Sequence, residues 1–192
     1  RNPLNVATGR LELAQETCDS DHLDHVDRAH DRMEALIEDL LALAREGDAV
    51  TDREPVDLAS LARTCWTNVD TRGATLVVDV DRTVRADESR AKQLLENLIR
   101  NAVEHGGPGV TVTVGDLADG FYVEDTGPGI PEDDRPEVFD TGFSTSRDGT
   151  GFGLSIVERV VEAHGWTVRV TAGSDVGARF EITGVEWATT SR

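Results

Sequence analysis

Apolar residues follow a heptad pattern over the first 48 residues, and this pattern limits how the chain can begin to fold. Spacings of three and four alternate along two stretches, and the polar segment Asp19–Asp21 between them can form a turn and cap a second helix. The first stretch contains Leu4, Ala7, Leu11, Ala14 and Cys18, and the second contains Leu23, Val26, His30, Met33, Ile37, Leu40 and Ala44. Such seams predict a helical hairpin that forms half of a dimeric four-helix bundle, so we expect a homodimer. At His30 we expect a core histidine in preference to a catalytic one.

A polar break around residues 45–55 separates the heptad stretch from short strands that alternate with helices. We expect Ala74–Val80 to pair with Thr83–Arg85 around a short turn. The other expected strands are Pro55–Leu58, Val110–Val114, Gly120–Val123 and a closing hairpin of Trp166–Val170 with Ala178–Ile182; the expected helices are Ala59–Val69, Glu88–His105 and Gly153–His164. The predicted fold class is therefore α+β, a helical hairpin followed by a sandwich with helices on one face of a mixed, largely antiparallel sheet. We place the two domains at 1–48 and 49–192.

The chain is strongly acidic, with 37 Asp+Glu against 19 Lys+Arg and a formal net charge of −18. This balance argues against a nucleic-acid partner, because clustered Lys and Arg hold phosphate backbones. Lys92 is the only lysine, and the acidic residues are spread along the whole sequence. A dispersed acidic surface keeps a protein hydrated in concentrated salt, so we favour a halophilic source, a haloarchaeon, over an acidic mesophile.

Cysteine content and hydropathy both point to the cytoplasm. Cys18 and Cys65 are too few for a disulfide scaffold, and two isolated thiols fit a reducing compartment. The longest mostly apolar stretch, Leu36–Ala44, is far shorter than the ~20 residues that a membrane span needs. We expect neither a membrane segment nor a signal peptide in this chain. Attachment of a longer native protein to a membrane through preceding segments stays open.

Two asparagines four residues apart, Asn97 and Asn101, fall on one face of the helix predicted at 88–105. A neutral amide oxygen can complete the octahedral shell of a magnesium ion whose other ligands are phosphates and waters. The pair alone is weak support for such a site, since exposed helix faces often carry asparagines at this spacing.

An acidic residue and two glycines follow a predicted strand in the segment Glu124–Pro131, which reads E-D-T-G-P-G-I-P. Glycines allow backbone to approach a flat ligand closely. A carboxylate at that place can accept a hydrogen bond from an exocyclic amine such as that of adenine, which makes Asp125 the candidate specificity residue. The alternative is an ordinary surface turn, because Asp, Gly and Pro are turn residues in any case.

A third motif, Gly149–Leu154, leads directly into the helix predicted at 153–164. Unpaired backbone amides and the positive end of the helix dipole make such a place an anion site. Its G-x-G-x-G spacing differs from the dinucleotide-binding fingerprint. The polar segment before it, about 131–152, has a length typical of a functional lid. Arg147 is the candidate phosphate ligand of that lid, and the alternative is an exposed surface arginine.

Taken in this order, the motifs resemble those of the histidine kinases of two-component signalling. These kinases belong to the GHKL ATPase superfamily with DNA gyrase, MutL and the ninety-kilodalton heat-shock chaperones. Glu96–His105 is similar to the kinase N box, Val123–Pro131 to the first glycine box, Val138–Thr145 to the F box, Gly149–Val157 to the second glycine box, and Arg1–Leu4 to the end of the H box. The resemblance covers essentially the whole chain. It implies a dimerisation and phosphotransfer hairpin joined to a Bergerat-type ATP-binding domain.

The same resemblance implies a binding role for each matching residue. Asn101 would ligate magnesium, and Asn97 would support the cluster of phosphates and metal. Asp125 would bind the adenine amino group, and His105 would lie against the base. The implied ATP-binding residues are Asn97, Asn101, His105, Asp125, Gly127, Gly129, Ile130, Ser144, Thr145, Arg147, Gly149, Thr150, Gly151, Gly153 and Leu154, with Phe139 and Phe143 as anchors of the lid.

The implied reaction is in-line transfer of the γ-phosphoryl group from Mg-ATP to a histidine nitrogen, for relay to an aspartate of a response regulator. By the family pattern the acceptor histidine stands three positions before Arg1, so we expect this chain to be a fragment that lacks it. His22, His25 and His30 have no H-box context. Asn2 would help water to dephosphorylate the regulator, and its alternative role is plain helix surface.

Two other functions remain open. A GHKL-type ATPase that couples hydrolysis to conformational change places a glutamate four residues before the metal-binding asparagine, where this chain has Asn97, with Glu96 one step away. A non-catalytic nucleotide-binding dimer module is opposed by the intact motifs. Glu104 departs from the kinase pattern, in which many members carry Lys or Arg, so charge neutralisation would fall to Arg147 or to magnesium.

Overall fold

The computed structural model describes residues 50, 52–71, 73–140, 142–143, 151–174 and 176–188, together with the single positions 11, 13, 14, 23, 26 and 33. The predicted hairpin, including His30, therefore lies almost wholly outside the described residues, and the domain boundary remains a prediction. The description below concerns the α+β part of the chain.

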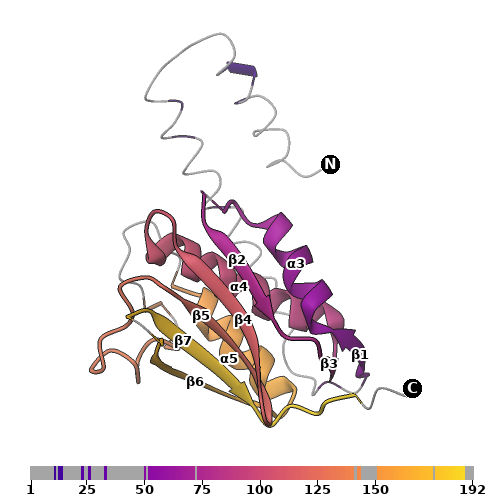
Figure 1. Cartoon of the computed structure of the whole chain (residues 1–192). Coiled ribbons are helices and arrows are strands. Elements are labelled where there is room, and N and C mark those ends of the chain that lie inside the picture. Colours follow the sequence, from indigo (N-terminus) through magenta and orange to yellow (C-terminus); the bar gives the residue numbers. More distant parts are fainter. Residues whose placement is uncertain are drawn as a thin grey trace.

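A five-stranded mixed sheet with three helices on one face forms this part (Figure 1). The strand order is β2-β4-β5-β7-β6; β2 and β4 are parallel, and the other neighbours are antiparallel. The strands of the sheet are β2 (Thr75–Asp79), β4 (Thr111–Leu117), β5 (Gly120–Asp125), β6 (Thr167–Ala172) and β7 (Ala178–Thr183); the helices are α3 (Leu58–Asn68), α4 (Glu88–Gly106) and α5 (Gly153–Ala163). The predicted fold class is thus confirmed for this part of the chain.

The expected pairing of the second and third predicted strands, Ala74–Val80 and Thr83–Arg85, is wrong. Strand β3 (Thr83–Ala86) pairs instead with β1 (Glu54–Asp57) in a separate two-stranded antiparallel sheet, while β2 joins β4 in parallel. Val56 and Val84 lie opposite each other in the small sheet, and both are buried. The alternation of apolar residues determines which face of a strand is buried but carries no information about its partner strand.

Helix α4 is the central element of the core, because its apolar face packs between the sheet and both other helices. Asp87 caps its first turn by accepting a hydrogen bond from the amide of Arg90 at 3.0 Å. The helix ends at Gly106, and its C-cap is Gly107, whose φ of 82° is unfavourable for residues with a side chain. The buried face consists of Ala91, Leu94, Leu95, Leu98, Ile99, Ala102 and Val103. Each Leu or Ile in it contributes roughly 1.5–3 kcal/mol through burial.

His164, which follows α5, holds this helix against the start of α4. The ring is buried and stacks on Trp166 with a centroid distance of 4.2 Å. Its Nε2 accepts a hydrogen bond from the amide of Asp87 at 3.1 Å, so Nδ1 carries the proton and donates to the carbonyl of Val160 at 2.7 Å. The backbone carbonyl of His164 accepts a hydrogen bond from Arg53. This geometry requires the neutral ring, and burial lowers the pKa of His164 below its ordinary value.

We predict that the core loses stability as the pH falls below about 6.5, the ordinary histidine pKa. The unfolded chain then binds a proton that buried His164 resists, so stability is present above that pH and is lost as the pH falls. The variant His164→Gln can still accept from the Asp87 amide but cannot be protonated. Urea unfolding at pH 7.5 and 5.5 should show a smaller pH-dependent loss in the variant, by up to about 1.4 kcal/mol per pH unit. Equal losses in both proteins would contradict this role.

Candidate functional site

Three segments that are distant in the sequence meet at the C-terminal half of α4. The loop after β5 contacts the end of α4 so closely that a Cβ added to Gly127 would lie 2.6 Å from the Cα of Gly106. The start of α5 faces the same helix, where a Cβ added to Gly153 would lie 3.2 Å from Oδ1 of Asn97. The structure therefore brings together the described residues of the asparagine motif and of both glycine motifs.

Asp125 ends β5 with a carboxylate that is only 8% exposed. Its Oδ1 accepts hydrogen bonds from the amides of Gly127 at 2.8 Å and Ala178 at 3.3 Å. No described residue donates a hydrogen bond to Oδ2. Burial raises the pKa of Asp125, although the two amide bonds act in the opposite direction. A buried carboxylate with one free oxygen is an acceptor available to a ligand.

Backbone of the loop after β5 and of the turn between β6 and β7 packs closely beside Asp125. Gly129 has a φ of 76°, and a Cβ there would lie 2.5 Å from the carbonyl oxygen of Val176 in the turn between β6 and β7. His105 is exposed and close enough that a positive charge on it lowers the pKa of Asp125. Ile130 is partly buried and packs against the core.

The two asparagines of α4 have different surroundings. Asn97 is buried, donates from Nδ2 to the carbonyl of Gln93 at 2.9 Å, and has its Oδ1 near the start of α5. Asn101, one turn further, is half-buried, and its side-chain amide has no hydrogen bond to another described residue. The amide of Asn101 is therefore available to a ligand, while that of Asn97 is partly committed to the helix.

Helix α5 begins without a side-chain cap among the described residues. Its N-cap is Phe152, and the hydroxyl of Ser155 donates to the Phe152 carbonyl instead of accepting from an amide. The first amides of this helix, at Gly153 and Leu154, are then left to other acceptors. Unpaired amides with the positive end of the helix dipole form a site suited to an anion.

Residues 131–140, 142–143 and 151–152 of the predicted lid are described. Gly142 donates to the carbonyl of Gly151 at 3.0 Å, which brings the two ends of the segment together. A Cβ on Gly151 would lie 2.7 Å from the carbonyl carbon of Gly142. Phe139 packs edge-on against Phe180 with a centroid distance of 6.4 Å, as expected of an anchor, whereas the role of Phe143 stays a prediction. Outside the described residues lie Ser144, Thr145, Arg147, Gly149, Thr150 and Asn2.

Sequence reasoning missed the contribution of the turn between β6 and β7. Ala178 supplies one of the two amides bound to Asp125, and Gly177 lies so close to the Asp125 carbonyl oxygen that no Cβ fits between them. Gly106, against which Gly127 packs, was also missed. The glycines flanking the turn, Gly173 and Gly177, are the only signal in the sequence that could have indicated a close approach of backbone.

A cavity of about 110 Å³ lies elsewhere, between the end of α3 and the neighbouring face of α4. Its lining consists of Asn68, Val69, Asp70, Arg100, Val103 and Glu104, none of which is a predicted ATP-binding residue. Among the described residues, no group of three His, Cys, Asp or Glu side chains could hold a metal ion, and no helix has the length and hydropathy to cross a membrane.

The sequence matches two families of known proteins. Residues 86–185 match the histidine kinase-, DNA gyrase B-, and HSP90-like ATPase family, and residues 1–49 match the His Kinase A (phospho-acceptor) domain. The probable sensor histidine kinase TcrY of Mycobacterium tuberculosis is 34% identical over 90% of this chain and 41% of its own length. The sensor histidine kinase ZraS of Klebsiella oxytoca is 32% identical over 94% of the chain and 42% of its own length.

Solved structures agree with the sequence matches. Full-length ShkA in complex with AMPPNP superposes with a TM-score of 0.72 and 30% identity, over 98% of this chain and 44% of that one. The mycobacterial sensor histidine kinase MprB gives a TM-score of 0.61 and 30% identity, over 70% of this chain and 97% of that one. The chain belongs to the histidine kinase-, DNA gyrase B- and HSP90-like ATPase family. Within that family it is a histidine kinase core that spans less than half the length of TcrY and ZraS.

We predict that Asp125→Asn leaves the protein at least as stable as the wild type at neutral pH. The amide oxygen of Asn can accept from Gly127 and Ala178 as Oδ1 does now, while the buried charge is removed. Since the pKa of Asp125 is raised, its contribution to stability is present at low pH and is lost as the pH rises through that pKa. Thermal unfolding at pH 7.5 measures the difference. A markedly lower Tm in the variant would show that the charge is needed for folding.

Proposed function

We propose that this chain binds Mg-ATP and forms the catalytic core of a two-component sensor kinase. The γ-phosphoryl group passes to a histidine upstream of Arg1 and from there to an aspartate of a response regulator. The observation that carries the proposal is the buried carboxylate of Asp125, to whose Oδ2 no described residue donates, close to the end of the helix α4 that carries Asn101. The complex of the neighbour ShkA with AMPPNP supports the same ligand class.

The adenine ring is proposed to lie beside Asp125. Both bonds that Asp125 accepts use Oδ1, so Oδ2 is available for the exocyclic amine of the base. Gly127 and Gly129 leave no side chain in the way, and Ile130 and His105 are proposed to contact the ring. A base that presents a carbonyl in place of the amine would place two acceptors face to face, so this site favours adenine over guanine.

The phosphates are proposed to occupy the space between α4 and the start of α5. The first amides of α5, at Gly153 and Leu154, would bind phosphate oxygens, with Asn97 beside them. Asn101 would ligate the magnesium ion, whose role when bound is to neutralise charge on the phosphates. The protein then acts by positioning the nucleotide and excluding water. Gly151 and the lid residues Ser144, Thr145, Arg147, Gly149 and Thr150 complete the proposed phosphate site.

We propose a division at residue 48, with a dimerisation and phosphotransfer hairpin before it. Val26 and Met33 belong to the predicted apolar seam and are 53% and 47% exposed in the single chain, which supports pairing with a second copy. The partner in relay would be a response-regulator receiver domain, with Asn2 assisting its dephosphorylation. We place this core in the cytoplasm, whether or not the longer protein is attached to a membrane.

Hydrolysis coupled to a conformational cycle is the disfavoured alternative. Such an enzyme needs a glutamate aimed at water near the γ-phosphate. Glu96 instead points towards α3, because its Oε1 accepts a hydrogen bond from Nδ2 of Asn68 at 2.8 Å. The same oxygen also pairs with Lys92, one turn earlier on α4, at 3.7 Å. Asn97 stands at the position where the ATPases place their glutamate, and its amide cannot act as a base.

The proposed function predicts that Asp125→Asn weakens Mg-ATP binding severely while the fold is retained. An amide at this position would turn its NH2 group towards the adenine amine and lose the bond.

Asn101→Ala should weaken Mg-ATP binding and abolish phosphotransfer. Calorimetry of both variants measures affinity, with Asn68→Ala on neighbouring α3 as the matched control. Wild-type affinity in Asp125→Asn would remove it from the adenine site.

Phosphotransfer itself is tested by intact-protein mass after incubation with Mg-ATP. The present chain is compared with one extended upstream by its native residues, while ADP release is followed. Phosphate on the extended chain alone would support the kinase and locate its acceptor before Arg1. Release of ADP with neither chain modified would favour the hydrolysing relatives.

We also propose that this protein works in concentrated salt, as the net charge of −18 and the single lysine suggest. Repulsion among dispersed carboxylates acts over ~10 Å at 0.1 M salt but only ~3 Å at 1 M. The circular dichroism spectrum should therefore lose structure in dilute buffer and recover it in molar KCl. A spectrum that is the same at both salt concentrations would contradict a halophilic source.

A further inference from the structure

The turn between β6 and β7 contacts two walls of the proposed adenine site. Its described residues are Gly173, Ser174, Val176 and Gly177, and a hydrogen bond of 2.7 Å runs from the Gly173 amide to the Gly177 carbonyl. Gly177 lies directly on the Asp125 backbone, and the next amide, that of Ala178, binds the Asp125 carboxylate. Val176 lies against Gly129 on the other side. The position of this turn therefore determines how the Asp125 carboxylate is held.

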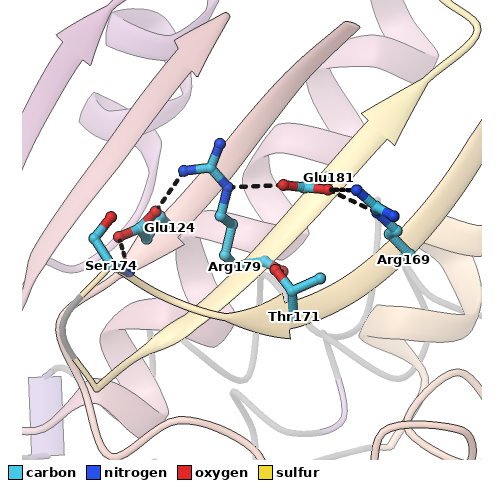
Figure 2. Close-up of polar contacts among 6 residues, drawn as sticks. All are labelled: Glu124, Arg169, Thr171, Ser174, Arg179 and Glu181. Atoms are coloured by element: carbon cyan, nitrogen blue, oxygen red, sulfur yellow. Dashed lines mark hydrogen bonds and ion pairs between the residues drawn. The ribbon is translucent and has the colours of Figure 1, made fainter. Parts of the chain in front are cut away.

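One carboxylate on the opposite face of the sheet ties both sides of this turn to β5. Oε1 of Glu124 accepts from the amide of Ser174, within the turn, at 2.7 Å. Oε2 accepts from the guanidinium of Arg179, immediately after the turn, at 2.8 Å. Figure 2 shows Glu124 between these two partners. Burial raises the pKa of Glu124, but its bonds with Ser174 and Arg179 outweigh this effect and lower the pKa overall.

Arg179 is itself restrained from three directions. Besides Glu124, it donates from Nε to Glu181 at 3.0 Å, and its guanidinium stacks on the ring of Tyr122 at 3.5 Å from the centroid. The far oxygen of Glu181 accepts from Nε of Arg169 at 2.7 Å, which ends the row of charges in Figure 2. The side chain of Arg179 is thus held in one geometry, and its bond to Glu124 is part-buried.

We propose that Glu124 and Arg179 are positioning residues for the adenine-binding carboxylate of Asp125. Successive side chains of a strand point to opposite faces, so Glu124 lies on the outer face and cannot touch a nucleotide bound on the helix side. The ion pair between Glu124 and Arg179 acts through the turn between β6 and β7. By holding this turn in place, it keeps the Ala178 amide bound to Oδ1 of Asp125, so that Oδ2 can face the base. This inference rests on the proposed function of the site.

The test compares Arg179→Gln and Glu124→Gln with the matched control Arg169→Gln. The control removes a charged partner of Glu181 from the same face of the sheet without touching the turn. Both test variants should raise the Kd for Mg-ADP about tenfold, the scale of one charge-assisted hydrogen bond. The control should stay within about twofold of the wild type, as exposed ion pairs contribute little. Glu124→Gln keeps a side-chain oxygen that can accept from the Ser174 amide, so it disturbs the fold less. If Arg179→Gln does not fold, Glu124→Gln alone tests the proposal.

A second readout does not depend on nucleotide. The amide proton of Ala178, followed by NMR, should shift upfield and exchange faster with solvent in both test variants, while that of Val123 in β5 changes little. A merely structural role would accelerate exchange at both amides together. An unchanged Kd in the folded test variants, an equal rise in Arg169→Gln, or an unaffected Ala178 amide would each overturn the proposal. If the wild type binds no Mg-ADP, the proposed function fails, and the Ala178 amide still tests the positioning by itself.

Discussion

Helix α4 must bury one face in the core and still present its C-terminal half to the site, and the rest of the fold follows this constraint. Its apolar face packs against the sheet, α3 and α5, while the Asp87 cap and the ring of His164 hold its first turn. The carboxamides of Asn97 and Asn101 are carried on a rigid support as a result. Rigid supports hold polar groups more accurately than loops do.

The second constraint is the opposite orientation of two neighbouring carboxylates, Glu124 and Asp125. Strand geometry sends one to each face of the sheet, and both are tied to the turn between β6 and β7. The outer carboxylate is neutralised by Arg179, so its charge costs little there. The inner one is desolvated and keeps an oxygen free, which is costly for stability but useful for recognition. Because Glu124 and Arg179 hold the turn from the outer face of the sheet, no further side chain is needed beside Asp125 on the inner face.

Much of the α+β part and of its site could be predicted from the sequence. The apolar periodicity of α4, the Asp87 cap and the alternation in β4 and β5 are local patterns, and each element formed within a few residues of its expected bounds. The motifs around Asn97, Asp125 and Gly153 lie close together in the fold, while their binding roles stay predictions. The pairing of β2 with β3 could not be predicted correctly, because periodicity describes the faces of a strand and not its neighbours.

The sequence by itself determined the helices and strands, their buried faces and the side chains that we propose bind a nucleotide, since these depend on interactions between residues close along the chain. Only the tertiary structure decided that Ala178 donates to Asp125, that Gly106 lies against Gly127, and that Arg179 restrains Glu124. Each of these contacts joins segments brought together by sheet order. An amide that binds through its backbone leaves no signature in its own side chain, so the sequence does not reveal which acceptor it binds.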